Sequence, residues 1–343
     1  MLRVLRRGVD MARMVILGAG LVGAFVAQHL SEHDVLVIDS SADALARIDC
    51  TTMQGDALSE EVLEMQGIDV WINMLPGGIA HAVRKPLLSR GQTVVDLAFT
   101  LEDPRSIRGG KMVYDVGIAP GLSNLWSAAI EELDSLEIMV GGIPTEPDEG
   151  WSYMAPFSPA DVIEEYTRPA RIKLNGELVE LPALERRQLV DYPSIGTLEA
   201  GLTDGLRSLL DTISANTMLE YTLRWPGHYD KWFQRTSYDG LLEEWKFDEQ
   251  RPEMTVLSID AKLTDGNDWH GMLIDRGKDG WSSMARTTGL VTLAAVDAAL
   301  LGLIPEGVHP PEGIPELLEL AETRLLQAGV HIERDSFKER PIA

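Results

Sequence analysis

The chain has little cysteine and no long apolar run. Cys50 is the only cysteine in 343 residues, so no disulfide can form within the chain, as is typical of the reducing cytoplasm. With no cysteine pair and seven scattered histidines, we expect no metal site. No run of about 18 apolar residues indicates a transmembrane helix. We therefore expect a cytoplasmic protein with no membrane partner.

Basic residues are also scarce. The chain has 30 Lys and Arg against 54 Asp and Glu, which gives a formal net charge of −24. Nucleic acid would be repelled by such a surface, so we expect no nucleic-acid partner. A small cationic substrate would be attracted to it. Solubility, or adaptation to a salty cytoplasm, explains the acidity equally well.

The first residues, MLRVLRRGVDMARMV, carry Arg3, Arg6 and Arg7 but lack the continuous apolar segment and the cleavage site of a signal peptide. We interpret residues 1–10 either as a short leader or as the product of a start assigned too early, with Met11 the true start.

Residues 12–122 alternate between short apolar strands and amphipathic helices. This alternation is typical of a doubly wound parallel sheet, so the predicted fold class is α/β of the Rossmann type. The predicted strands lie in the segments RMVILGAG, DVLVIDS, CTTMQGD, DVWINMLPGG, QTVVDLAF and KMVYDVG. One helix, IAHAVRKPLLSRG, contains Pro86, which we expect to disturb its interior.

The pattern changes after residue 122. Residues 123–282 contain alternating, more widely spaced strands and most of the tryptophans, which predicts an α+β domain with a mixed or antiparallel sheet. In residues 283–343, one helix is predicted from Ser283 to Leu301 and another from Pro315 to Gly329.

The segment VILGAGLVGAFVA has the spacing G-x-G-x-x-G at Gly18, Gly20 and Gly23, between a predicted strand and a predicted helix. The first glycine permits the tight turn, the second lets the backbone approach a pyrophosphate, and the third allows close packing of helix and strand. Asp39 closes the next strand, about 20 residues further on, where an acidic side chain binds ribose hydroxyls.

A 2′-phosphate would be repelled by Asp39, and no arginine follows it to bind one. We therefore predict NAD rather than NADP as the cofactor. The residues expected to line this cofactor site are Gly18, Gly20, Leu21, Val22, Gly23, Asp39 and Ser40.

Two further strand ends are expected at the same carboxyl edge of the sheet, where ligands bind in such folds. Asp56 and Ala57 follow the third strand, near the expected adenine position, although Asp56 could instead cap the following helix. Asn73, Leu75 and Pro76 follow the fourth strand, beside the expected pyrophosphate and nicotinamide ribose.

Several segments occur together in the order seen in one known family: GAGLVG, INMLPG, VVDLA, DVGIAPGLSN, VGGIP, RWPGH and SMARTTG…GVHPPE. The chain resembles the saccharopine dehydrogenase family over nearly its whole length, and within it is most similar to the L-lysine 6-dehydrogenase branch. The run GIAPGLSN followed by GGIP is the most specific part of this resemblance.

The resemblance implies a dinucleotide domain completed by C-terminal helices, and an inserted α+β domain that binds substrate and forms a homodimer. It also implies hydride transfer between a nicotinamide and the amine-bearing carbon of a basic amino acid. Saccharopine reductases have an acidic residue where this chain has Ala119, and some have a cysteine where it has Val140. These departures favour the deaminating branch, which oxidises the side-chain amine of L-lysine to 2-aminoadipate 6-semialdehyde.

Imine hydrolysis after such an oxidation needs a base that activates water. Asp96 and Asp115, at the ends of the fifth and sixth strands, and His228, after Pro-Gly, are the candidates. A buried carboxylate can acquire a raised pKa, and histidine titrates near neutrality. Each aspartate could instead cap a helix or pair with an arginine, and His228 could be structural.

An amino-acid substrate also needs a cation for its α-carboxylate, and arginine binds carboxylates with two hydrogen bonds. Arg286, near the start of a helix, and Arg224, in RWPGH, are the candidates, although either could be a solvated side chain. Thr203 and Asp204 could hold the carboxylate and the α-amine, or form a turn with the following glycine. Asn124 lies in the GIAPGLSN run, which we interpret as the hinge between cofactor and substrate.

Two other functions stay open. One is a reductase of the saccharopine or carboxynorspermidine type, whose substrate needs room for a second chain beyond the nitrogen. The other is a sensor that binds NAD without turnover, because a Rossmann fold does not fix function.

Overall fold

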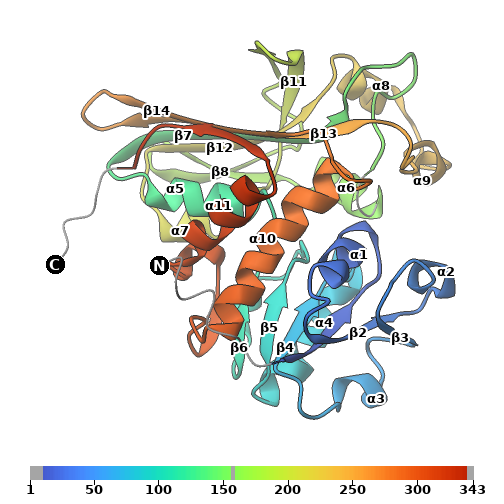
Figure 1. Ribbon diagram of the computed structural model, residues 1–343. Helices are drawn as coiled ribbons and strands as arrows, with labels where there is room; N and C mark the ends of the chain where they lie inside the picture. Colours follow the sequence, from blue (N-terminus) through green and yellow to red (C-terminus); the bar gives the residue numbers. More distant parts are fainter. Residues whose placement is uncertain (1–10, 156–158, 338–343) are drawn as a thin grey trace. The chain divides into compact units, whose positions relative to one another are not determined.

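The computed structural model describes residues 11–155 and 159–337 (Figure 1). The chain divides into two compact units. Unit 1 extends to Gly117 and includes Thr288–Arg324, and unit 2 comprises Ile118–Thr287 and the residues from Leu325 onward. No helix in the described part of the chain is long and apolar enough to cross a membrane.

Unit 1 is built on a parallel sheet. Among the described residues, seven strands pair in the order β15-β6-β5-β4-β1-β2-β3, and every pairing is parallel. The order from β3 to β6 is that of a doubly wound dinucleotide-binding sheet. The strands are β1 (Arg13–Leu17), β2 (Asp34–Asp39), β3 (Thr51–Gln54), β4 (Val70–Asn73), β5 (Thr93–Asp96), β6 (Lys111–Val113) and β15 (Gly307–His309).

The helices of unit 1 alternate with these strands. They are α1 (Leu21–Gln28), α2 (Ala42–Leu45), α3 (Glu60–Leu63), α4 (Gly77–Ser89) and short 3-10 turns at Pro104–Ser106 and Pro311–Gly313. Contrary to expectation, α4 continues through Pro86. Val15, Trp71, Leu87 and Val94 are among the buried side chains of the core formed by the strands and α4.

Two C-terminal helices, α10 (Ser283–Leu300) and α11 (Leu317–Gln327), begin in one unit and end in the other. Within unit 1, α10 packs closely on α1, because a Cβ on Gly289 would lie 2.4 Å from the Phe25 ring. Arg324 of α11 forms a bidentate ion pair with Asp297 of α10. These contacts join the C-terminal helices to the dinucleotide fold.

Unit 2 contains a mixed sheet of nine strands in its described part. The central order is β10-β11-β12-β7-β13-β14-β16; β7 and β12 are parallel, and the other neighbours are antiparallel. The strands are β7 (Leu133–Pro144), β8 (Ala170–Leu174), β9 (Glu177–Leu181), β10 (Gln188–Tyr192), β11 (Gly196–Leu202), β12 (Thr217–Arg224), β13 (Glu253–Leu263), β14 (Asp268–Asp275) and β16 (His331–Arg334).

The helices of unit 2 are α5 (Leu122–Ala129), α6 (Pro159–Thr167), α7 (Leu209–Thr212), α8 (His228–Gln234) and α9 (Leu241–Glu244). Aromatic side chains from α6, α8 and the residue directly after α9 pack together in one cluster that includes Tyr166, Tyr229, Trp232 and Trp245. The predicted fold class, a Rossmann-type parallel sheet plus a second domain with a mixed sheet, is confirmed.

Candidate functional site

The glycine turn lies between β1 and α1 in unit 1. Gly18 has a φ of +107°, and a Cβ there would lie 2.8 Å from the Met74 carbonyl oxygen. A Cβ on Gly23 would lie only 2.2 Å from the Gly18 carbonyl oxygen, so α1 can approach the turn only with glycine at this position. The first and third glycines therefore have the steric roles expected from the sequence.

Gly20 differs from its two neighbours in the motif. It is exposed, and no atom lies within 4 Å of a Cβ built on it. It is also the N-cap of α1, and no side chain caps this helix end. The start of α1 thus has no capping side chain and leaves open space beside the glycine, an arrangement that can receive a phosphate. Leu21 and Val22, the next two residues, are half-buried.

Asp39 closes β2 beside this turn. Its Oδ2 accepts a hydrogen bond from Ala19 N at 2.7 Å, and its Oδ1 accepts one from Ser41 N at 2.8 Å. Each carboxylate oxygen can accept a further bond, so these contacts orient Asp39 without exhausting it. Ser40, next to it, is exposed. The residues present therefore fit a dinucleotide whose pyrophosphate lies at Gly20 and whose ribose hydroxyls bind Asp39.

Asp56 is exposed after β3, and its Oδ1 accepts a hydrogen bond from Leu58 N. The N-cap of α3 is Ser59, whose hydroxyl accepts a bond from Val62 N. The alternative that Asp56 caps this helix is therefore wrong, while its contact with adenine stays a prediction. Ala57 belongs to the hydrophobic core of unit 1, so only its backbone can reach a cofactor.

At the end of β4, Asn73 is fully buried and its side chain binds within the protein. Its Nδ2 donates to Asp96 Oδ2 at 2.7 Å and to the Ala80 carbonyl. Leu75 lies in the core, and Pro76 is exposed as the N-cap of α4. A cofactor passing this strand end would meet the backbone and Pro76 rather than the Asn73 amide.

Asp96, at the end of β5, is completely buried against Arg84 of α4. Arg84 Nε donates to Oδ2 at 2.9 Å and Arg84 Nη2 donates to Oδ1 at 2.8 Å. Thr100 Oγ1 and the Ala98 carbonyl accept the remaining Arg84 hydrogen bonds. The alternative considered for Asp96, pairing with an arginine, is thus the arrangement observed, and it disfavours Asp96 as a base.

Asp115 follows β6 and is 1% exposed. Its φ of +56° lies in the left-handed region, which is uncommon for a residue other than glycine. Although burial lowers the pKa of Arg84, the charges of Asp96 and then of Asp115 raise it above its usual value. The carboxyl group of Asp115 therefore lies in the same charged environment as the Arg84–Asp96 pair, at the carboxyl edge of the sheet.

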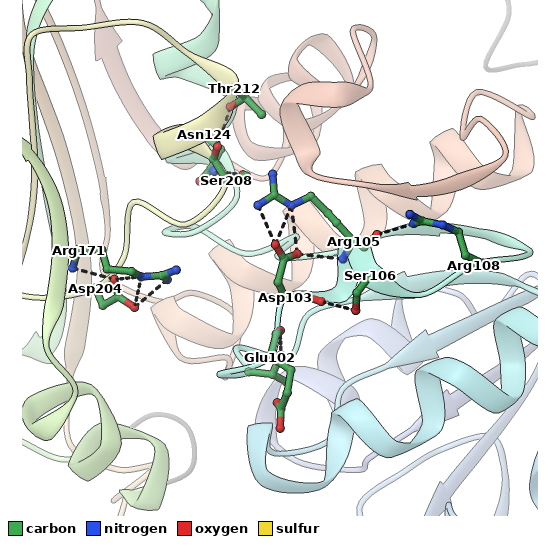
Figure 2. Close-up of polar contacts among 11 residues, drawn as sticks. Glu102, Asp103, Arg105, Ser106, Arg108, Asn124, Arg171, Asp204, Ser208 and Thr212 are labelled. Atoms are coloured by element: carbon green, nitrogen blue, oxygen red, sulfur yellow. Dashed lines mark hydrogen bonds and ion pairs between the residues drawn. The ribbon is translucent and has the colours of Figure 1, made fainter. Parts of the chain in front are cut away.

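In unit 2, Asn124 is fully buried in the first turn of α5 (Figure 2). Its Oδ1 accepts a hydrogen bond from Gly121 N at 3.1 Å, and its Nδ2 donates to Ser208 Oγ at 3.1 Å. The side chain thereby closes the GIAPGLSN turn and joins it to the segment before α7. This geometry gives Asn124 a positioning role, and its contact with substrate stays a prediction.

His228 opens α8 inside the aromatic cluster and is 1% exposed. Burial, followed by the charge of Arg224, lowers the pKa of His228 to about 3. Its Nδ1 is 3.0 Å from the Trp151 carbonyl, which fits a neutral ring that donates there and accepts at Nε2 from Tyr166 Oη. The expectation that His228 titrates near neutrality is therefore wrong, and the structural alternative is favoured.

The two candidate arginines differ in what they bind. Arg286 is 5% exposed, and it donates to both oxygens of Asp275 and to the Ala328 carbonyl. It is therefore not the solvated residue considered above, but its guanidinium is already occupied by a carboxylate.

Arg224 is 2% exposed, and its guanidinium carbon lies 4.3 Å from the Tyr153 ring centroid and 5.4 Å from that of Tyr166. Nη1 donates to the Leu223 carbonyl at 2.8 Å. Nε is buried and has no hydrogen-bond partner among the described residues. A buried guanidinium with an unused donor is a stronger candidate for a substrate carboxylate than one already paired.

Thr203 and Asp204 follow β11 and are buried, and each binds other side chains. Arg171 Nε and Nη2 each donate to Asp204 at 2.9 Å (Figure 2), while Arg168 Nε lies 3.4 Å from the same carboxylate. Thr203 Oγ1 and Glu220 Oε2 form a hydrogen bond of 2.6 Å. Asp204 is thus occupied by arginines, which disfavours a contact with the substrate amine.

Sequence reasoning missed several buried polar residues around these sites. No signal in the sequence indicated Arg84, because it lies in an amphipathic helix, where a basic residue is usually exposed. Glu220 lies in β12, whose residues are almost all buried, and Glu165 lies in α6. An acidic residue within a strand as apolar as MLEYTL was the available signal for Glu220. In the described part of the chain, no group of three or more His, Cys, Asp or Glu residues is placed to hold a metal.

Two family models match the chain. Residues 117–246 match the saccharopine dehydrogenase C-terminal domain, and residues 14–71 match the TrkA-N domain. Apo saccharopine dehydrogenase (L-Glu forming) from Saccharomyces cerevisiae has a similar fold, with a TM-score of 0.75 at 17% identity over 95% of this chain and 100% of that chain. GenD2 from gentamicin A biosynthesis, solved in complex with NAD, gives a TM-score of 0.46 at 12% identity over 95% and 97% of the two chains.

The protein is thus of a two-unit class, a Rossmann-type dinucleotide fold joined to a mixed-sheet unit. Its second unit matches the saccharopine dehydrogenase C-terminal domain over 117–246, and the resemblance to the saccharopine dehydrogenase family is confirmed.

Proposed function

We propose that the protein is an NAD-dependent oxidoreductase that acts on the amine-bearing carbon of a basic amino acid. The favoured reaction is oxidative deamination of L-lysine at its side-chain amine to 2-aminoadipate 6-semialdehyde. One observation carries the reaction class: a dinucleotide fold with an open glycine turn shares the chain with a saccharopine dehydrogenase C-terminal domain. Ala119 and Val140 favour deamination over saccharopine reduction.

The glycine turn and Asp39 are proposed to hold the cofactor. The uncapped start of α1 would bind the pyrophosphate, and Asp39, oriented by Ala19 N and Ser41 N, would bind the ribose hydroxyls. NAD, when bound, would accept the hydride from the amine-bearing carbon. A carboxylate at this position repels a 2′-phosphate, so NAD is proposed over NADP.

Arg224 is proposed to bind the α-carboxylate of the substrate. Its unused Nε would complete a two-point contact, and the rings of Tyr153 and Tyr166 shield the guanidinium from water. Of the three candidate bases, Asp96 is held by Arg84 and His228 is neutral with both nitrogens engaged. Asp115 is therefore the proposed base that activates water for imine hydrolysis.

An NADH absorbance assay with a panel of amines tests the reaction class. We expect NADH to form from NAD with lysine and, at a lower kcat/KM, with 1,5-diaminopentane, and not with ornithine, saccharopine or longer polyamines. Turnover of saccharopine would favour the reductase alternative, and NAD binding without turnover of any amine would favour the sensor. Asp115→Asn should lose turnover while its affinity for NAD is unchanged; near-normal turnover would remove Asp115 as the base.

The role of Arg224 can be isolated with a substrate that lacks the carboxylate. Removing one partner of a buried charge pair costs at least about 2 kcal/mol, so Arg224→Met should lower kcat/KM for lysine by at least about 30-fold. The same variant should change kcat/KM for 1,5-diaminopentane little, because this diamine has no carboxylate to bind. Arg187→Met, which changes an exposed arginine of the same unit, is the control. Equal losses for both amines would contradict the assignment.

A further inference from the structure

Four oxygen-bearing side chains form a hydrogen-bonded series in unit 2. Glu165 lies on α6, Glu220 and Thr222 lie on β12, and Thr203 follows β11. Glu220, Thr203 and Thr222 are 2%, 1% and 4% exposed, whereas Glu165 is half-buried. The series thus has one end, Glu220, enclosed in the protein and the other end, Glu165, nearer to the surface.

Three hydrogen-bond contacts connect these side chains in series. Thr203 Oγ1 is 2.6 Å from Glu220 Oε2 and 2.9 Å from Thr222 Oγ1. Thr222 Oγ1 in turn contacts Glu165 Oε1 at short range. Glu220 Oε2 also accepts a hydrogen bond from Gly205 N at 3.0 Å.

The number of protons available does not match these contacts if both carboxyl groups are ionised. Each hydroxyl supplies one proton, and an ionised carboxylate supplies none. Two threonine protons cannot satisfy three oxygen–oxygen contacts, so one contact would join two acceptors without a proton between them. A third proton, carried by one of the carboxyl groups, satisfies all three contacts at once.

We propose that Glu165 and Glu220 share one proton near neutral pH, and that the hydroxyls of Thr222 and Thr203 relay it between them. These four side chains are called the carboxyl relay below. In one arrangement Glu220 is protonated and donates to Thr203, which donates to Thr222, which donates to the Glu165 carboxylate. In the other, Glu165 donates to Thr222, which donates to Thr203, which donates to the Glu220 carboxylate.

The two arrangements contain the same atoms and the same total charge. Conversion from the first to the second breaks the Glu220 O–H bond and forms a Glu165 O–H bond, while each threonine oxygen releases one proton and gains another. No oxidant, reductant or further proton donor is needed. The proton therefore moves from the enclosed end of the carboxyl relay to the half-buried end without diffusion of any group.

The charges around the carboxyl relay support a bound proton. Burial raises the pKa of Glu220 to about 8, and the charges of Glu165 and Asp204 add to this rise against the hydrogen bonds from Thr203 and Gly205. Asp204 is itself paired with Arg171 and Arg168. The charges of Glu165 and Glu220 also act on Tyr229, and the charge of Glu165 acts on Arg224. Two adjacent carboxyl groups away from water hold a common proton for the same reason as other carboxyl pairs.

Use of this proton in catalysis rests on the proposed function. Oxidation of an amine requires its ammonium form to lose a proton first, and Glu165 acts electrostatically on Arg224, the proposed carboxylate-binding residue. The half-buried end of the carboxyl relay is therefore the acid–base group of unit 2 that we associate with the substrate. The shared proton itself does not depend on this use.

Infrared difference spectroscopy tests for the shared proton. At neutral pH, the wild-type protein should show a protonated-carboxyl C=O band that shifts in D₂O and disappears as the pH rises through about 8. Glu220→Gln should remove this band. Glu165→Gln should shift the band and make it disappear at a lower pH, because glutamine supplies an N–H to Thr222 and removes a charge that raises the pKa of Glu220. Thr292→Val, a buried threonine whose hydroxyl donates only to backbone carbonyls, is the control and should retain it.

Two spectroscopic outcomes would contradict the shared proton. A band that persists unchanged in both glutamine variants, or a wild-type difference spectrum without one, would overturn the shared proton. Circular dichroism would verify that each variant is folded, and Glu165→Gln, at a half-buried position, is the variant expected to disturb the fold least. A protein inactive toward every amine would remove the proposed function and leave this spectroscopic result unaffected, so the two failures are distinguishable.

Discussion

The buried pair of Arg84 and Asp96 gives the sharpest test of how unit 1 is stabilised. Both side chains are 0% exposed, and two hydrogen bonds of 2.8 and 2.9 Å join them. Asp96→Asn keeps the shape of the side chain but removes its charge. The substitution leaves the Arg84 guanidinium in the protein interior without its main counter-charge, which is far costlier than loss of one hydrogen bond.

The expected cost is about 3–5 kcal/mol, the range for breaking a buried ion pair by removing one partner. Asp115 also acts on Arg84 and offsets part of the loss, so the lower half of this range is expected. Such a loss is a large fraction of the roughly 5–15 kcal/mol that stabilises a typical fold. Replacing both partners, Arg84→Met with Asp96→Leu, should recover part of the stability because the Arg84 charge is removed with its partner, while Asn73 Nδ2 and Ala98 N lose Asp96 as acceptor.

Urea denaturation at fixed pH, with the slope m compared between variants, measures the change in the free energy of unfolding. Because the chain has two units, hydrogen exchange of the β4, β5 and α4 amides would assign the loss to unit 1. A loss below about 1 kcal/mol for Asp96→Asn would refute the reasoning, since it lies within the range of exposed pairs. Loss of turnover with normal stability would instead restore Asp96 as a catalytic base.

Three further changes have definite expected outcomes. Gly23→Ala would place a Cβ 2.2 Å from the Gly18 carbonyl, so NAD affinity measured by calorimetry should fall at least about tenfold; unchanged affinity would contradict the steric role of this glycine. Asp39→Ser should raise the ratio of NADP to NAD activity by at least about tenfold, or the carboxylate does not select the cofactor. The pKa of Glu220 is raised to about 8 in the folded protein, so the native state binds more protons than the unfolded state between the two pKa values. The free energy of unfolding should therefore fall as the pH rises from the unfolded pKa toward 8, by up to about 1.4 kcal/mol per pH unit. Glu220→Gln should abolish this slope in pH-dependent denaturation between about 7.5 and 8.5, where His228 is neutral in the folded state and almost completely neutral in the unfolded state; a slope that persists would show that another group causes it.

The sheet of unit 1 could be predicted because most of its first six strands alternate with helices at a regular spacing. The seventh strand, β15, could not, because it has three residues in a segment rich in proline and glycine. In unit 2, β16 was also missed. Strand β16 has four residues and is defined by its pairing with β14, about sixty residues earlier in the sequence, which no local pattern encodes.

The geometry of the glycine turn was more predictable than the surroundings of the candidate arginines for a physical reason. A glycine turn is a local requirement: three positions within one turn determine whether a backbone can approach another group. Whether Arg224 or Arg286 is available to a substrate depends instead on Asp275, which is paired with Arg286, and on Tyr153, which lies against Arg224. These partners are distant in the sequence, so residue type alone could not rank the two arginines.

The same limit explains three aspartates that look alike in the sequence. Asp39, Asp96 and Asp115 each end or follow a strand of one parallel sheet, so each was a candidate for function on equal grounds. Asp39 accepts only backbone N–H groups and stays half-buried, which leaves lone pairs for a ligand. Asp96 is neutralised by Arg84, and Asp115 takes a left-handed backbone conformation that a residue other than glycine adopts only when the surrounding structure imposes it. The position of an aspartate at a strand end therefore places it at the sheet edge where ligands bind. Whether its carboxylate is available to a ligand depends on the neighbouring helix, because Arg84 of α4 pairs with Asp96.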